Sequence, residues 1–308
     1  MTESLRSLEG RHAPGGGAWW NESWYFDFAA ADGSIGGYVR IGLYPNQQRA
    51  WCWVYIVDAE GTIVVRDHDV PFPKPESLLA RSDGLWCELI CETPMEHWSI
   101  GVEAFGVRLD DPLDSYSGEI GTRMAVGLEL EWETIAPAFH YPYPPEYPSM
   151  HYQHTGKVHG LILLGDETIE FDGFGERDHS YGDRDWWLFG WNWASAYFNS
   201  TFTMHTLKGD HGLFTDGYIW RGAEPLRVTS LEAESTFDDD GLLASARYVV
   251  NDALGVRVEP LFHAPIPLID GTGRTSRFPR SLCRFTTDAG DVGYGWSEYL
   301  QVGRLTVG

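Results

Sequence analysis

Hydrophobic and polar residues alternate with a period of two along most of the chain. The alternation is clearest in GGYVRIGLY (36–44), AWCWVYIVD (50–58), MAVGLELEWETI (124–135) and LFGWNWASAYF (188–198), and glycine, aspartate and asparagine separate such segments. This period is typical of β-strands joined by turns. Because no segment of ten or more residues carries a capped helical period, the pattern predicts an all-β protein.

A proline-rich segment interrupts the alternation near the middle of the chain. It reads APAFHYPYPPEYP over residues 136–148, and its prolines cannot donate the hydrogen bonds of a sheet ladder. With 308 residues the chain is long enough for two domains. We therefore expect an N-terminal domain over residues 1–150 and a C-terminal domain over residues 151–308.

The charge balance is strongly acidic, with 22 basic and 45 acidic residues and a net charge of −23. Such a surface repels phosphate backbones, which argues against a nucleic-acid partner. No apolar run has the length of a signal peptide or of a bilayer-spanning segment. The sequence thus predicts a cytoplasmic protein with no integral membrane segment.

The densest group of charged residues is GFGERDHSYGDRDWW, residues 173–187. In a strand, the alternation places Asp178 on one face and His179 on the other. A buried carboxylic acid with a raised pKa can donate a proton at neutral pH, so this pair is a candidate for acid–base chemistry. The alternative is a structural network in which Arg177 and Arg184 pair with neighbouring carboxylates.

The sequence does not indicate a site that binds a metal or a cofactor. His151, His154 and His159 lie close together in MHYQHTGKVHG, but the strand period separates His154 from the other two, and no further ligand follows at metal-site spacing. The sequence also lacks GxSxG, a P-loop, a dinucleotide-binding GxGxxG, HExxH and paired CxxC. We expect no metal and no cofactor.

Tryptophan is abundant, at fourteen residues, and two interpretations of it remain open. The rings either fill the core or line a cavity for an apolar ligand. In residues 188–198 the alternation puts Trp191, Trp193 and Ser195 on a bulky face and leaves small residues on the other.

Three segments carry a resemblance to a known family. They are GKVHGLILLGDETIEFDGFGERDHSYGDRDWWLFGWNWASAYF (156–198), FTDGYIWRG (214–222) and VGYGWSEYLQ (292–301). In order and spacing they resemble the second half of the hydroxyneurosporene synthase and AttH-like family, with Asp178 and His179 in its DH motif. The chain departs from the family motif at Ser180 and Tyr181, where the family has Glu and Trp, so no substrate is inherited.

The resemblance implies two tandem lipocalin-like (calycin) antiparallel β-barrels with an aromatic-lined pocket. Family members include carotenoid hydratases, which add water to an isoprenoid double bond without a cofactor, and related cyclases. Carried over, Asp178 is the proton donor. Glu298 is then the base that delivers water, and His179 orients the acid.

These features predict a cofactor-independent hydratase, dehydratase, isomerase or cyclase that protonates a terpenoid, steroid or polyene-like substrate, with aromatic rings stabilising the cation. The expected substrate-binding residues are Glu22, Tyr25, Trp187, Trp191, Trp193, Tyr181 and Trp296. Two alternatives remain: a non-catalytic carrier for a hydrophobic small molecule, in which the charged segment is a structural latch, and an interaction protein with an acidic surface.

Overall fold

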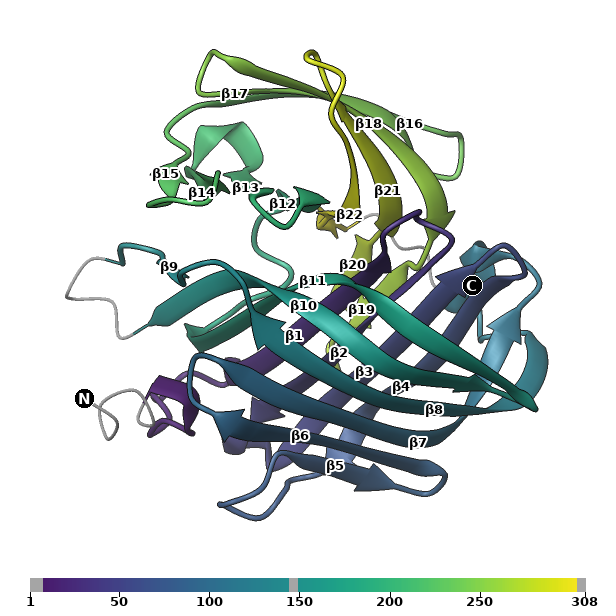
Figure 1. Ribbon diagram of the computed structural model, residues 1–308. Coiled ribbons are helices and arrows are strands. Elements are labelled where there is room, and N and C mark those ends of the chain that lie inside the picture. The colour runs from purple at the N-terminus through teal and green to yellow at the C-terminus, as the bar shows by residue number, and fades with distance from the viewer. Residues whose placement is uncertain (1–7, 144–148, 304–308) are drawn as a thin grey trace.

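The computed structural model describes residues 8–143 and 149–303 of the chain, and nearly all regular structure there is β-strand. Figure 1 shows two large antiparallel sheets, the first forming a barrel and the second arching above it. The all-β class and the pair of barrel-like units expected from the sequence are confirmed, with the difference that the second unit is an open half-barrel.

The first sheet contains eleven strands. They are β1 (Trp20–Ala30), β2 (Ile35–Tyr44), β3 (Arg49–Asp58), β4 (Gly61–Pro71), β5 (Leu79–Ser82), β6 (Leu85–Thr93), β7 (His97–Leu109), β8 (Gly121–Thr134), β9 (Phe139–His140), β10 (Met150–Leu164) and β11 (Glu167–Asp183). Their order is β4-β3-β2-β1-β11-β10-β8-β7-β6-β5, with β9 beside β10. Because β4 also pairs with β7, the strands from β4 through β1 and β11 to β7 form a closed ring.

The second sheet has nine strands in the order β15-β14-β13-β12-β22-β21-β18-β17-β16. They are β12 (Trp191–Asn199), β13 (Phe202–Gly209), β14 (Thr215–Trp220), β15 (Leu226–Arg227), β16 (Leu231–Phe237), β17 (Leu243–Val250), β18 (Leu254–His263), β21 (Arg280–Thr287) and β22 (Val292–Tyr299). Within the described ranges no pairing joins β15 to β16, so this sheet stays open. A small third sheet consists of β19 (Ile266–Ile269), β20 (Thr275–Phe278) and β23 (Gln301–Val302).

Helical structure is limited to short turns in the described part of the chain. Apart from a turn at residues 8–9, these are the 3-10 helices η1 (Pro45–Gln47), η2 (Pro112–Tyr116) and η3 (Asp210–Gly212). None of the helices there has the length and apolar character needed to cross a bilayer.

Strands β1, β2 and β3 are buried on both faces. Trp24 and Val39 belong to the apolar cluster inside the barrel, whereas Tyr25 and Tyr38 belong to a second cluster between the two large sheets. This double burial explains why the three strands are rich in aromatic and aliphatic residues at consecutive positions. In β7, which is covered on one side, buried and less buried residues alternate.

The change of sheet does not coincide with the boundary predicted between residues 150 and 151. Strands β10 and β11 pair with β8 and β1, so residues 150–183 complete the barrel instead of opening the second unit. The chain enters the second sheet only at Trp191. A local break in the sequence pattern marks a loop, but it does not reveal which distant strand the next segment will join.

A buried ion pair lies inside the barrel. The guanidinium of Arg177 is within 6 Å of the rings of Trp98 and Trp132, at 4.8 and 5.6 Å from their centroids. Its Nη1 and Nη2 donate to the two carboxylate oxygens of Glu9, at 2.9 and 2.5 Å. Burial alone would raise the pKa of Glu9, but the charge and hydrogen bonds of Arg177 outweigh it and lower this pKa to about 2. The pair attaches the segment before β1 to the barrel.

The E9Q variant is expected to lose about 3–5 kcal/mol of unfolding free energy at pH 7, because it leaves the charge of Arg177 buried without a carboxylate. Since the folded-state pKa of Glu9 is lowered, wild type should lose this contribution as the pH falls from about 4.5 to about 2, whereas E9Q should not. Urea unfolding across this pH range measures both effects.

The matched control is D288N, which removes the carboxylate from the exposed pair of Arg247 and Asp288. Its stability should equal that of wild type, because exposed ion pairs contribute little. An E9Q variant as stable as D288N would contradict the role assigned to the buried pair.

Candidate active site between the two sheets

A row of five side chains crosses the barrel wall that faces the second sheet. The strand registers pair Trp53 with Arg40, Arg40 with Tyr25, Tyr25 with Asp178 and Asp178 with Gln153. Directly paired residues point to the same face of an antiparallel sheet, with Cβ atoms about 5 Å apart. The register therefore brings a cation, a phenol, a carboxylate and an amide into one line.

The second sheet places a complementary row against this line. Glu298 is paired in register with Trp193 on one side and Arg280 on the other. Arg280 Nη1 lies 2.7 Å from Glu298 Oε2, and Arg280 Nη2 donates to the hydroxyl of Tyr25. The rings of Tyr25 and Trp193 meet edge to face, with centroids 5.9 Å apart. The two rows thus form one continuous layer of polar and aromatic groups.

Asp27 lies deeper in the same layer and is completely buried. Its carboxyl accepts from the backbone N–H of Glu176 at 2.8 Å, from the hydroxyl of Tyr197 at 3.0 Å and from that of Tyr25 at 3.1 Å. Burial is the largest influence and outweighs these hydrogen bonds, so the pKa of Asp27 rises to about 7. Burial also raises the pKa of Glu176 well above its usual range.

Asp178 and Glu298 have pKa values that are displaced in opposite directions. Burial would raise the pKa of Asp178, but the adjacent His151, with Nε2 at 3.8 Å, and the charges of Arg184 and Arg40 lower it. Burial raises the pKa of Glu298 despite Arg280, and the charge of Asp178 adds to this rise. The lowered pKa favours the ionised form of Asp178, whereas the sequence predicted a neutral donor at this position.

Two members of the barrel row have polar atoms without a hydrogen-bond partner among the described residues. Arg40 is 3% exposed, and its Nη1 and Nη2 have no hydrogen bond of normal geometry. Burial lowers the pKa of Arg40, and the charge of Tyr44 and a weak side-chain hydrogen bond with it oppose this. Its guanidinium lies 4.5 Å from the ring centroid of Trp53 and 5.4 Å from that of Trp186. Gln153 Oε1 is likewise unpartnered. These atoms can bind an oxygen-bearing group within the layer.

The structure brings five of the predicted site residues together. Asp178, Glu298, Tyr25, Trp193 and Trp191 all belong to the layer between the sheets, and Trp191 Nε1 donates to Glu298 Oε1 at 3.2 Å.

Two predicted substrate-binding tryptophans hold structural hydrogen bonds. Trp296 is fully buried and donates to the carbonyl of Phe28 at 3.1 Å. Trp187 donates to the carbonyl of Leu268 at 3.2 Å. Both belong to the apolar cluster between the sheets.

The remaining predicted residues lie on the opposite face of β1 and β11. His179 Nε2 is 3.0 Å from Glu22 Oε1, and its ring stacks on Trp24 inside the barrel. Tyr181 stacks on His12 at the same end of the barrel. His179 therefore cannot orient Asp178, because the wall of the barrel separates the two side chains.

The three histidines of the MHYQHTGKVHG segment do not converge. His151 faces the layer beside Asp178, whereas His154 contacts Trp132 of the barrel core, at 4.8 Å between ring centroids. His159 lies near the exposed Glu133. The strand period had correctly predicted that His154 faces the opposite side of β10 from His151.

The sequence reading missed Arg40, Arg280 and Asp27. Arg40 and Asp27 each lie among aromatic and aliphatic residues, in YVRIG and WYFDF, and Arg280 is the first residue of β21. A charge at such a position must be buried with partners or placed in a site, and that signal was available.

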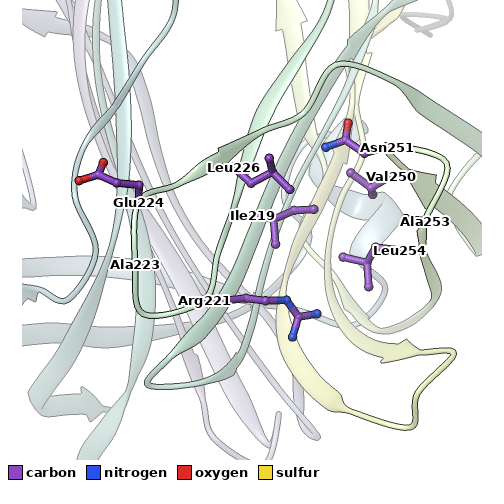
Figure 2. A pocket seen from close by; sticks show the side chains of 9 residues that line it. All are labelled: Ile219, Arg221, Ala223, Glu224, Leu226, Val250, Asn251, Ala253 and Leu254. Carbon is purple, nitrogen blue, oxygen red and sulfur yellow. The ribbon is translucent and has the colours of Figure 1, made fainter.

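Two surface cavities lie away from this layer. Figure 2 shows one of about 320 Å³ between the β14–β15 region and the turn from β17 to β18, lined by Ile219, Leu226, Val250 and Leu254 among others. A second of about 430 Å³ lies beside residues 134–138 and includes His154. Neither contains a residue of the polar rows, so the electrostatics of the layer, and not cavity volume, identify the candidate site.

Comparison with known proteins defines the family and the fold. A family model described as Domain of unknown function (DUF7064) matches residues 6–303. No curated protein sequence matches the chain. The resemblance to the AttH-like family is confirmed at the level of fold by the structure of an AttH candidate from Nitrosomonas europaea, with 13% identity and a TM-score of 0.65 over 96% of this chain and 95% of that one.

Two further solved structures share the fold. CghA with bound Sch210972 has 11% identity and a TM-score of 0.54, covering 95% of this chain and 93% of its own. Kievitone hydratase from Nectria haematococca has 10% identity and a TM-score of 0.57, covering 93% and 90%.

The raised pKa of Asp27 generates a test of the layer's electrostatics. Because the folded-state pKa is raised to about 7, wild type should lose stability as the pH rises from about 4 to 8, and D27N should be spared this loss. Between pH 4 and pH 8, the free energy of unfolding of wild type should therefore fall by roughly 2–4 kcal/mol relative to that of D27N. Denaturant unfolding at pH 4, 6 and 8 measures it.

The matched control is D172N, the same change at an exposed position on β11, whose profile should run parallel to that of wild type. Parallel profiles for D27N and wild type would show instead that Asp27 is ionised throughout.

Proposed function

The chain belongs to the DUF7064 family, and we propose that it is a cofactor-independent acid–base enzyme that acts on a hydrophobic small molecule in the layer between its two sheets. The observation that carries the proposal is the pair of carboxyls with opposite displacements, Asp178 lowered and Glu298 raised. Titratable groups pushed apart in this way are suited to separate acid and base roles.

The proposed roles exchange those expected from the sequence. Ionised Asp178, whose side chain is 17% exposed, accepts a proton from the substrate or from an attacking water. Glu298 is the carboxyl that donates a proton, with its side chain 10% exposed and held by Arg280 and Trp191. Both side chains keep a small exposed fraction, whereas Asp27 is fully buried and accepts a hydrogen bond from Tyr25.

The surroundings suit a substrate that is largely apolar and carries an oxygen function. Tyr25 and Trp193 supply aromatic surface, and the buried guanidinium of Arg40 can stabilise a developing negative charge on oxygen. Hydration, dehydration, isomerisation and cyclisation of terpenoid, steroid or polyene-like compounds all fit this arrangement. The shared fold with kievitone hydratase and with CghA, which was solved with a small molecule, supports the class of reaction by analogy.

Substitution of Asp178 tests the proposal. D178N is expected to lower turnover by about 10²–10⁴-fold, because it removes the base, while ligand affinity stays close to that of wild type. The full chain is incubated with a terpenoid and steroid extract, and mass spectrometry follows compounds that change by one water or that isomerise at constant mass. Native mass spectrometry of the same mixtures measures ligand binding.

D172N again serves as the control, because it makes the same change on β11 away from the layer, and it should turn over like wild type. If D178N keeps full activity, Asp178 is not the base. If wild type binds a compound and releases it unchanged, the protein is a carrier. In that case D178N should lower the melting temperature, and neither protein should show turnover.

A further inference from the structure

Three side chains that can bind a metal ion converge at one end of the barrel. His12 comes from the segment before β1, Glu22 from β1 and His179 from β11. One nitrogen of each histidine and one oxygen of the glutamate all lie within 4.8 Å of one another. His12 lies outside the histidine motif singled out in the sequence, and fold closure alone brings the three together.

The distances and the donor types suit a zinc-like ion. Glu22 Oε1 is 2.7 Å from His12 Nδ1 and 3.0 Å from His179 Nε2. Around a tetrahedral zinc ion with bonds of about 2.0–2.1 Å, neighbouring ligand atoms are about 3.3 Å apart. Two imidazoles and one carboxylate form a donor set that borderline divalent metals prefer. Binding one ion requires His12 to move so that the three atoms, which now lie within 4.8 Å of one another, surround the ion at bonding distance.

The surrounding residues hold the three side chains in place. Trp24 stacks on the ring of His179 at 4.4 Å between centroids, and Tyr181 stacks on His12 at 4.2 Å. The backbone N–H of His12 donates to Glu22 Oε2 at 2.9 Å. Such outer contacts orient the ligands of a metal site.

An ion can reach the cluster from solvent. Glu22 and His179 are buried, at 1% and 0% exposure, whereas the side chain of His12 is 24% exposed. His12 therefore forms the accessible side of the cluster, while the neighbouring Glu9 and Arg11 attach its segment to the barrel.

We propose that His12 Nδ1, His179 Nε2 and the Glu22 carboxylate bind one divalent transition-metal ion of the zinc type. The ion joins the segment before β1 to the barrel wall and leaves a coordination position for solvent. This site is independent of the proposed acid–base layer, because Glu22 and His179 occupy the opposite face of β1 and β11 from Tyr25 and Asp178. It replaces the expectation that the chain has no metal site.

Calorimetric titration of zinc chloride into the chelator-treated, tag-free full chain tests the proposal. Wild type should bind one equivalent, and zinc should raise its melting temperature. H12A should weaken this binding at least tenfold and abolish the thermal shift. Because His12 is partly exposed and lies outside the sheets, this variant should fold, and E22Q provides a second variant that keeps the size of the ligand.

The matched control is H97A, which removes the histidine from the partly exposed pair of His97 and Glu131, 2.6 Å apart. It should bind zinc as wild type does. If H12A and E22Q bind zinc as tightly as wild type, or if wild type binds none, the proposal fails and the cluster is a hydrogen-bonded anchor only.

Discussion

Burial of both faces of β1, and of the part of β11 that pairs with it, is the constraint on which the structure depends. One face of β1 closes the barrel and the other lies against the second sheet, and residues 175–180 of β11, which pair with β1 and with β10, are nearly all buried, so polar side chains in this stretch need partners. Arg177 is therefore paired with Glu9 inside the barrel, and Asp178 is surrounded by His151, Arg40 and Arg184 outside it. The density of charged residues in this segment follows from the need to pair buried charges on both faces of the strand.

The sequence pattern correctly predicted the features that depend only on neighbouring residues. The two-residue period established the all-β class and correctly sent Asp178 and His179 to opposite faces, since alternation is a property of any strand. The period did not reveal that β11 pairs with β1, about 150 residues earlier, and this pairing puts residues 150–183 in the barrel. It also did not reveal which face would meet the second sheet, so the role of His179 was misjudged.

The candidate site was likewise predictable only in part. Asp178 was recognised from the density of charged residues in its segment, and Glu298 and Tyr25 from the resemblance to the AttH-like family. Their ionisation could not be foreseen, because it depends on Arg280, Arg40 and His151, which come from separate strands. Distant members of the fold, with 10–13% identity, preserve the architecture while sharing few residues. The shared fold therefore does not determine the chemistry, which depends on the individual side chains of each protein.

The back-to-back placement of the two clusters limits how this chain can change length. Glu22 and Tyr25 lie on opposite faces of β1, and His179 and Asp178 on opposite faces of β11. Inserting or deleting one residue within either strand would turn every following side chain to the other face. Such an event would move the carboxylate of the layer into the barrel and the histidine into the layer. Insertions and deletions are therefore expected in the loops, and the lengths of β1 and β11 are expected to stay constant.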